Sequence, residues 1–191
     1  SFFQANTWFR LASARAGYVN GGGDWAIDSN VPDSFRALAS GGEIAVRNKI
    51  ATRPWQHVLE PLSGYLWLAA RLVAESREEV DLDSAFNFGP LLTSNRTVAE
   101  LVQEIIKHTG GKWYDASDPA ARHEASKLNL ATDKAFHLLK WQSVWNFEET
   151  IARTVDWYLA TTKGSDPADL TRAQILAYQS SAAQKSIPWA L

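Results

Sequence analysis

Cysteine and methionine are both absent from the 191 residues of this sequence. Without cysteine, the chain cannot contain a disulfide framework, a thiolate nucleophile or a zinc–thiolate site. An excess of one charge is also lacking, because 19 lysines and arginines oppose 21 aspartates and glutamates and leave a net charge of −2. This balance gives no electrostatic attraction to nucleic acid or to an anionic membrane. We therefore expect neither as a partner.

Long apolar runs are missing as well. The longest apolar-looking stretch, residues 58–74, is interrupted by Glu60, Pro61 and Arg71. It therefore predicts a helix of the protein core and not a membrane span. No secretory signal pattern opens the sequence, and we expect a cytoplasmic protein. Residues 1–9 already lie inside an aromatic pattern without an initiator methionine, which indicates a piece of a longer protein.

The hydrophobic pattern is that of an α/β protein. Residues 11–19 and 84–88 are predicted as buried strands, and residues 43–47 alternate like a third strand. A helix is predicted over residues 58–76, with Pro61 in its first turn. Strand, helix and strand in this order predict that 11–19 and 84–88 are adjacent and parallel. The helix carries an apolar stripe at Leu62, Tyr65, Leu66, Ala69, Leu72 and Val73.

Capping signals locate the later helices. Thr97 followed by Glu100 is a capping-box pattern before an apolar periodic segment. Asn146 followed by Glu149 repeats this pattern, and Asp166-Pro167 predicts the start of a last helix that runs to about residue 180.

Shorter elements and the domain limits complete the prediction. Residues 31–40 are expected to form a short helix, and residues 112–115 an edge strand. No repeat or linker divides the chain, so we expect one domain over residues 1–178. Residues 179–191 lack periodicity and are expected to form an irregular tail.

A glycine-rich turn follows the first predicted strand. Gly21, Gly23 and Ala26 fit a degenerate form of the dinucleotide fingerprint. That fingerprint requires a helix immediately afterwards, so that the helix N-terminus meets the pyrophosphate. Here Asp24 and Trp25 follow, and no helix is predicted for several residues. The pattern therefore favours a turn that approaches a different ligand.

Arg53 and the histidines are the other candidates for a site. Arg53 precedes the 58–76 helix and could hold a phosphate through two hydrogen bonds. The alternative is a surface arginine stacked on Trp55, and the sequence leaves both interpretations open. The four histidines lack the spacing of metal ligands, so no metal site is expected.

Several motifs in order resemble the CDP-glucose 4,6-dehydratases, which are extended short-chain dehydrogenase/reductases. The resemblance covers residues 1–178 and corresponds to the C-terminal part of such an enzyme. Its most similar stretch is TRPWQHVLEPLSGYL, at residues 52–66. The other motifs are ARAGYVNGGGDWAIDSNVPD at 14–33, FNFGP at 86–90, TVAELV at 97–102, HEASKLNLATDKA at 123–135 and WNFEETI at 145–151.

The resemblance implies a fold and an activity. The fold would be the second half of a Rossmann-type parallel sheet, followed by a mainly helical C-terminal substrate-binding region. The activity would be that of a lyase in polysaccharide biosynthesis, which uses NAD to convert CDP-glucose into CDP-4-keto-6-deoxyglucose and water. The catalytic Tyr-x-x-x-Lys of the family is absent, because Tyr158 has Thr162 at that spacing and Lys163 is one place too far. No catalytic residue is therefore assigned to this chain.

The resemblance also implies substrate-binding residues. Arg53 would meet the pyrophosphate, Asp24 and Trp25 would line the nucleotide-sugar turn, and Asn87 would face the pocket from the carboxyl end of its strand. Tyr18 replaces the usual asparagine of the family and would intrude on the substrate or nicotinamide.

The implied cofactor-binding residues are Ala16 and Gly17, next to Tyr18 in the same segment.

Two functions remain open at this point. The chain is either the substrate-binding part of a dehydratase or a non-catalytic domain that binds a nucleotide sugar or a partner. Its expected partners are a CDP-sugar and either the missing N-terminal half or a second copy. Without that half, apolar faces should be exposed unless the N-terminal aromatics cover them. The residues of these faces are Leu11, Ala14, Val19, Leu66 and Val73, and the aromatics are Phe2, Phe3, Trp8 and Phe9.

Overall fold

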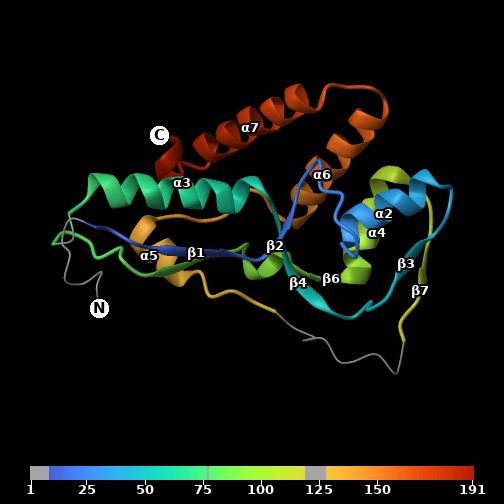
Figure 1. Cartoon of the computed structure of the whole chain (residues 1–191), viewed down its shortest axis with the longest axis horizontal. Helices are drawn as coiled ribbons and strands as arrows, with labels where there is room; N and C mark the ends of the chain where they lie inside the picture. Colours follow the sequence, from blue (N-terminus) through green and yellow to red (C-terminus); the bar gives the residue numbers. More distant parts are fainter. Residues whose placement is uncertain (1–8, 77, 119–127) are drawn as a thin grey trace.

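The computed structural model describes residues 9–76, 78–118 and 128–191, and these residues form a mixed α/β structure (Figure 1). The strands are β1 (Ser13–Ala16), β2 (Tyr18–Asn20), β3 (Ile44–Val46), β4 (Thr52–His57), β5 (Ala85–Phe88), β6 (Asn95–Thr97) and β7 (Trp113–Asp115). The helices are α2 (Asn30–Ala39), α3 (Leu59–Ala74), α4 (Val98–Thr109), α5 (Asp133–Leu139), α6 (Phe147–Thr162) and α7 (Pro167–Gln184). Short 3-10 turns cover Leu92–Ser94 and Pro188–Ala190. Within the described ranges, no helix has both the length and the apolar character needed to cross a bilayer.

Parallel strand pairs organise the structure, and they confirm the predicted α/β class. β1 pairs with β5 in parallel, with Ser13 opposite Ala85, and α3 lies between the two strands in the chain. This confirms the predicted strand–helix–strand unit. β2 pairs with β4 and β3 pairs with β7, both in parallel. β6 joins the other edge of β4 in the antiparallel direction.

The strand predicted over residues 11–19 is wrong in two respects. It divides at Gly17 into β1 and β2, which pair with different partners. A Cβ at Gly17 would lie 3.0 Å from Cγ of Pro54, so a larger residue here would require β4 to shift by a few tenths of an ångström. The strand is also largely exposed and not buried.

β4 was missed by the pattern analysis, which assigned its residues to the approach to a helix. The strand is almost wholly buried in spite of Arg53, Gln56 and His57, because β2 and β6 flank it and α6 covers it. Its polar residues concealed the strand pattern. Arg53 is 5% exposed, which excludes the surface alternative that the sequence left open.

The predicted helix caps are confirmed. Thr97 and Glu100 make both bonds of the capping box at α4. The Asn146 side chain accepts the N–H of Glu149 at 2.8 Å to begin α6. Asp166 accepts two backbone N–H groups at the start of α7.

The irregular tail predicted from residue 179 is wrong. α7 continues to Gln184, and a 3-10 turn follows at Pro188–Ala190. Ile187 is buried, and the Trp189 ring stacks on Tyr178 with the centroids 5.6 Å apart. The C-terminal residues thus fold back onto α7, near α3, as the red end of the chain shows in Figure 1.

The apolar stripe predicted on α3 faces outward over much of its length. Leu66 and Val73 are 73% and 89% exposed, whereas the helix buries Glu60, Pro61, Gly64 and Leu68. The stripe is therefore not the core side of the helix. The exposed apolar face predicted for the isolated chain is confirmed, because Leu11, Ala14, Val19, Leu66 and Val73 are all exposed. Phe2, Phe3 and Trp8 lie outside the described residues.

Candidate functional site

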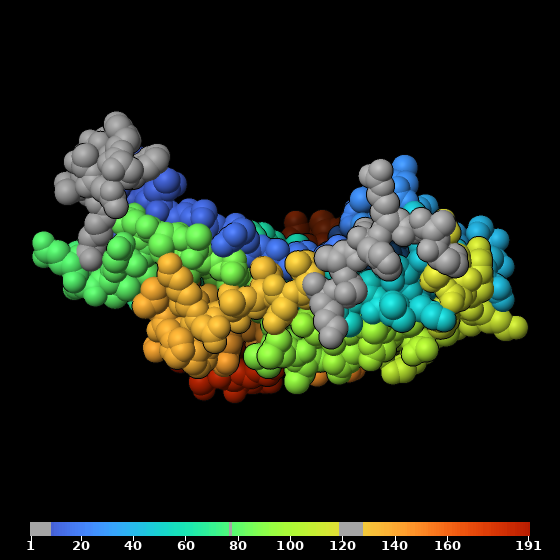
Figure 2. Space-filling view, turned by 90° about the horizontal axis from the view of Figure 1, so that it is seen from below, coloured from blue at the N-terminus to red at the C-terminus, as the bar shows by residue number. Residues whose placement is uncertain are grey.

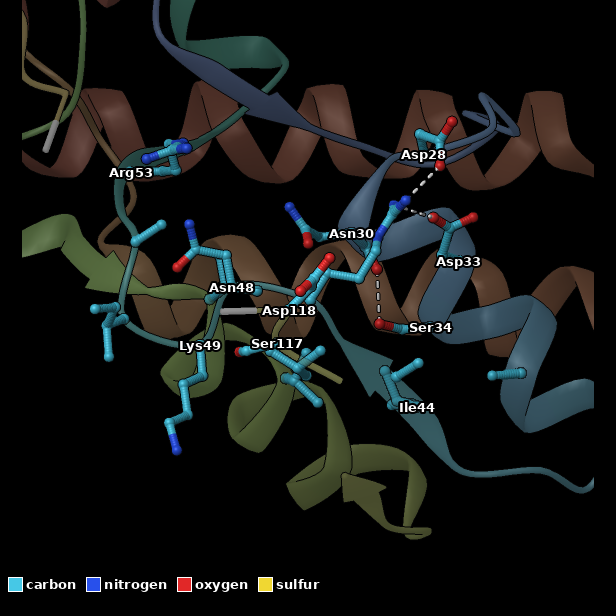
Figure 3. Close-up of a pocket in the computed structure, with 18 of the residues that line it drawn as sticks. Asp28, Asn30, Asp33, Ser34, Ile44, Asn48, Lys49, Arg53, Ser117 and Asp118 are labelled. Carbon is cyan, nitrogen blue, oxygen red and sulfur yellow. Dashed lines mark hydrogen bonds and ion pairs between the residues drawn. The ribbon is translucent and has the colours of Figure 1, made fainter. Parts of the chain in front are cut away.

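A cleft of about 970 Å³ opens beside β3, α2 and the loop that joins β3 to β4. Buried apolar residues such as Ile44, Val46 and Val102 form part of its lining. Around them stand amides, hydroxyls and charged groups (Figure 3). In the view of Figure 2, the upper outline of the molecule dips between the N-terminal strands and the lobe that contains α2 and β3. The polar lining residues include Asn30, Ser34, Asn48, Lys49, Arg53, Ser117 and Asp118.

Ion pairs fix the charged side of the cleft. Arg47 lies 2.7 Å from a carboxylate oxygen of Asp28 and 3.7 Å from one of Asp33. Asp28 adopts a left-handed φ of 64°, a conformation that aspartate accepts more readily than most residues. Lys49 pairs with Asp115 at 2.7 Å, and their hydrogen bond lowers the pKa of Asp115 to about 2. Two of the cations that line the cleft are thus held by carboxylates.

Arg53 and Tyr18 lie together at another part of the cleft. The Arg53 guanidinium carbon is 5.2 Å from the centroid of the Tyr18 ring, which is a cation–π distance. Tyr18 is opposite Trp55 in the β2–β4 register, and the two rings meet edge to face at 5.4 Å. Tyr18 is 39% exposed and Arg53 only 5%. The sequence left open a stack of Arg53 on Trp55, and the ring that it contacts is Tyr18.

Asp24 and Trp25 are not among the residues that line the cleft. The Tyr158 hydroxyl of α6 donates to the backbone carbonyl of Asp24, and the Trp25 ring meets Tyr158 edge to face at 5.1 Å. Arg36 of α2 donates to the carbonyls of Trp25 and Ala26. Burial, followed by the charge of Asp24, raises the pKa of Tyr158 to about 12, so this donor keeps its proton.

The glycines of this turn approach side chains of the protein itself. A Cβ at Gly22 would lie 2.0 Å from the Trp157 ring, and one at Gly21 would lie 2.7 Å from Val58. Among the described residues, no helix lies between this turn and Asn30. The described residues therefore do not form a dinucleotide cradle here. Packing accounts for these glycines, where the sequence had favoured a turn shaped for a ligand.

The remaining predicted residues gather near the end of the β1–β5 pair. Ala16 is opposite Phe88 in the register, and Gly17 follows it against Pro54. The Asn87 amide donates to the Ala131 carbonyl at 3.0 Å, and its own oxygen is buried without a hydrogen-bond partner among the described residues. None of these three residues lines the cleft.

His57, the last residue of β4, is buried. Its Nδ1 accepts the backbone N–H of Leu59 at 3.3 Å. Burial lowers the pKa of His57 to about 4, so the imidazole is neutral near pH 7. Over the part of the chain that the structure describes, no three side chains of histidine, aspartate or glutamate cluster as metal ligands.

The sequence pattern did not predict most of the polar residues that line the cleft. Arg47, Asn48 and Lys49 follow β3 directly, and only their position after a predicted strand could have indicated them. Asn30 and Ser34 lie one turn apart at the start of α2. Their convergence depends on how α2 packs beside β3, which no local pattern encodes.

Comparison with known proteins shows which proteins this chain is similar to. No model of a protein family matches the chain. The chain is 38% identical over 172 residues to CDP-glucose 4,6-dehydratase of Salmonella typhimurium, a match that covers 89% of this chain and 47% of that protein. The chain thus spans about half the length of this relative.

Solved structures share the fold at low sequence identity. UDP-glucose 4-epimerase of Thermotoga maritima, solved with UDP-glucose, matches with a TM-score of 0.69 and 21% identity, over 84% of this chain and 50% of its own. dTDP-glucose 4,6-dehydratase of Bacillus anthracis, solved with NAD, matches with a TM-score of 0.63 and 16% identity, over 82% and 47%. The chain is therefore a partial homologue of CDP-glucose 4,6-dehydratase with the Rossmann-type fold of nucleotide-sugar epimerases and dehydratases.

Proposed function

We propose that this chain is the nucleotide-sugar-binding part of a CDP-glucose 4,6-dehydratase, and that it acts as a lyase only together with the rest of such an enzyme. The observation that carries the proposal is the 38% identity to that dehydratase over 89% of the chain. The product would be CDP-4-keto-6-deoxyglucose, with loss of water. The absence of Tyr-x-x-x-Lys supports the second half of the proposal, because the chain then lacks the usual proton-transfer pair.

Arg53 and Tyr18 are the substrate-binding residues that the cleft supports best. A guanidinium presents a fork of donors that matches a phosphate, so Arg53 would hold the pyrophosphate. The Tyr18 ring steadies that guanidinium from one face. Asp24 and Trp25 would act at the rim, and Asn87 from the end of β5.

NAD would be bound mainly by the part of the enzyme that this chain does not match. When bound, it would supply the oxidation and the later reduction of the sugar. Ala16 and Gly17, at the carboxyl end of β1, would contact it from this side, since ligands of open α/β sheets bind outside the carboxyl ends of the strands.

Titration calorimetry with CDP-glucose tests this function. We expect the chain to bind CDP-glucose and CDP, and Arg53→Ala to weaken both about tenfold or more, because a charge-assisted hydrogen bond is worth about 1.5–3 kcal/mol. Arg172→Ala, at an exposed ion pair on α7, is the matched control and should leave binding unchanged. With NAD added, the isolated chain should form no 4-keto sugar. Absence of binding at millimolar ligand, an Arg53→Ala variant that binds equally well, or product from the pure chain would contradict the proposal.

A non-catalytic binding domain is the second candidate function. Tyr18 favours it, because this large ring stands where the family usually has asparagine. A domain that retains affinity for CDP but distinguishes poorly between CDP and CDP-glucose would fit this candidate.

The partner that completes the enzyme would bind the exposed face of β1 and α3. Among the described strands β1 pairs only with β5, so its other edge is open to a further strand. Leu66 and Val73 extend this surface along α3. Apolar patches of this kind mark interaction sites on soluble proteins. The half of the dehydratase outside the match would cover them.

Co-expression with the unmatched segment of the Salmonella relative tests this partner. We expect the two polypeptides to co-purify in equal amounts, and Leu66→Asp to weaken the complex at least tenfold by burying a charge. Leu176→Asp is the matched control, because Leu176 is comparably exposed on α7. Self-association of the chain that Leu66→Asp abolishes would identify a second copy as the occupant instead. No association of either kind would refute an interface here.

A further inference from the structure

A fully buried carboxylate connects three separate segments of the chain. Glu60, in the first turn of α3, has no exposed surface. Its Oε1 accepts the N–H of Trp145 at 2.7 Å, and its Oε2 accepts the N–H of Val144 at 2.9 Å. The hydroxyl of Tyr178 on α7 donates to Oε2 at 2.7 Å. Glu60 therefore holds both the segment before α6 and the C-terminal half of α7 against the start of α3.

A second hydroxyl extends this cluster. Ser63 Oγ lies 3.1 Å from the Tyr178 oxygen, where either group can be the donor. Ser63 donates to the Glu60 carbonyl at 2.7 Å and accepts the Trp141 indole N–H at 3.0 Å. Backbone and indole N–H groups are fixed donors, but a hydroxyl can rotate and exchange its roles. The cluster thus has two complete hydrogen-bond arrangements that differ by one proton.

We propose that Glu60, Tyr178 and Ser63 form a proton-responsive latch between α3 and α7, in which a proton on Glu60 turns the Tyr178 hydroxyl from Glu60 toward Ser63. In the ionised arrangement, Tyr178 and both backbone N–H groups donate to the carboxylate. In the protonated arrangement, Glu60 donates to the Tyr178 oxygen, and Tyr178 donates to Ser63, whose oxygen has two acceptor positions. Every donor is paired in both states, but the Tyr178–Ser63 hydrogen bond forms only in the protonated state, and only the ionised state holds a charge in the interior.

The surroundings of Glu60 favour its protonated, uncharged form below about pH 7. Burial raises the pKa of Glu60 to about 7, although the two backbone N–H groups, Tyr178 and the charge of Lys185 all lower it. The pKa of Tyr178 is raised by burial and by the charge of Glu60, so the hydroxyl keeps its proton. His57, near the start of α3, stays neutral with a pKa of about 4. Arg153 of α6 lies over the Trp145 ring at 5.2 Å.

The sign of the pH effect follows from this preference. A glutamate released from the latch ionises near its ordinary pKa of 4.5. Opening the latch therefore releases a proton between pH 4.5 and about 7. Within this range, the population of the opened form relative to the closed form rises up to about tenfold per pH unit. Above pH 7 both forms are ionised and the effect ends. We expect the end of α7 and the 187–190 turn to open more often as pH rises to neutrality.

Amide hydrogen exchange of residues 178–190, corrected for the intrinsic rate at each pH, tests the latch. We expect the opening equilibrium to rise several-fold to tenfold per unit between pH 5 and 7 and then to level off. Glu60→Gln should abolish this slope. Glu104→Gln is the matched control, because Glu104 is a mostly buried carboxylate at a separate ion pair on α4 and should leave the slope intact.

Infrared absorption of the protonated carboxyl gives a second measurement that does not depend on opening. Its Glu60 component should disappear with a midpoint near pH 7. Tyr178→Phe removes the donor to ionised Glu60 and also the acceptor of protonated Glu60. The bond to the charged carboxylate is the stronger of the two, so the midpoint should move upward, whereas a purely structural tyrosine would leave it unchanged. An ionised Glu60 throughout pH 5–9, a slope that persists in Glu60→Gln, or an unmoved midpoint in Tyr178→Phe would each overturn the proposal.

Discussion

Truncation of the chain after Gln184 is expected to lower the free energy of unfolding by about 3–6 kcal/mol, the sum for burying two large apolar side chains at about 1.5–3 kcal/mol each. The deletion removes Ile187, which is buried, and Trp189, which stacks on Tyr178. It also removes the Lys185 ammonium that donates to the Val144 carbonyl. Urea unfolding followed by circular dichroism measures the change.

The matched control is a chain that ends at Ala190. Leu191 is 85% exposed, so its removal should change stability by less than about 0.5 kcal/mol. If the truncation after Gln184 costs no more than this control, the C-terminal turn contributes nothing to the core, and the tail behaves as the sequence pattern suggested.

The parts of the fold that could be predicted depend on helix caps and on the order of the elements in the chain. Thr97 with Glu100 and Asn146 with Glu149 determine helix starts through bonds between residues three apart, which a sequence displays directly. The parallel β1–β5 pair followed from the order of elements, because a crossover helix between two strands favours that geometry.

The features that were predicted wrongly depend on contacts between residues that are far apart in the sequence. β4 carries polar residues inward because Gln56 donates to the Phe88 carbonyl and Trp55 to the Arg96 carbonyl, and neither acceptor is near in sequence. The end of α7 has no strong apolar face, yet Tyr178 and Ala182 are buried by the C-terminal turn and by α3. A periodicity analysis cannot represent such contacts.

The candidate site was predictable only in part for the same reason. Resemblance selected Arg53 and Tyr18, and the β2–β4 register brings them together at the cleft. Asp24 and Trp25 were selected on the same grounds, but Tyr158 and Arg36 hold them outside its lining. The polar loop at Arg47–Lys49 became part of the cleft only through packing.

Substitution of Gly64 on α3 is expected to lower the free energy of unfolding more than truncation of Leu66 on the same helix. A Cβ at Gly64 would lie 2.2 Å from the Phe88 ring, inside the cluster that also holds Leu68 and Trp141. Alanine normally stabilises a helix interior by about 1 kcal/mol relative to glycine. Here we expect Gly64→Ala to destabilise the protein by about 3 kcal/mol, because overpacking must displace α3 from β5.

Leu66→Ala, one half-turn away on the same helix, is the comparison. Leu66 is 73% exposed, so we expect its truncation to change stability by less than about 0.5 kcal/mol in the isolated chain. Thermal and urea unfolding of both variants measure the difference. A stabilised Gly64→Ala variant, or a larger loss in Leu66→Ala, would mean that α3 packs through its apolar stripe. The expected result would explain why Leu66 and Val73 stay exposed at no cost to the stability of the isolated chain: the helix contacts its own core through Gly64 and Leu68 and leaves these two side chains for another surface.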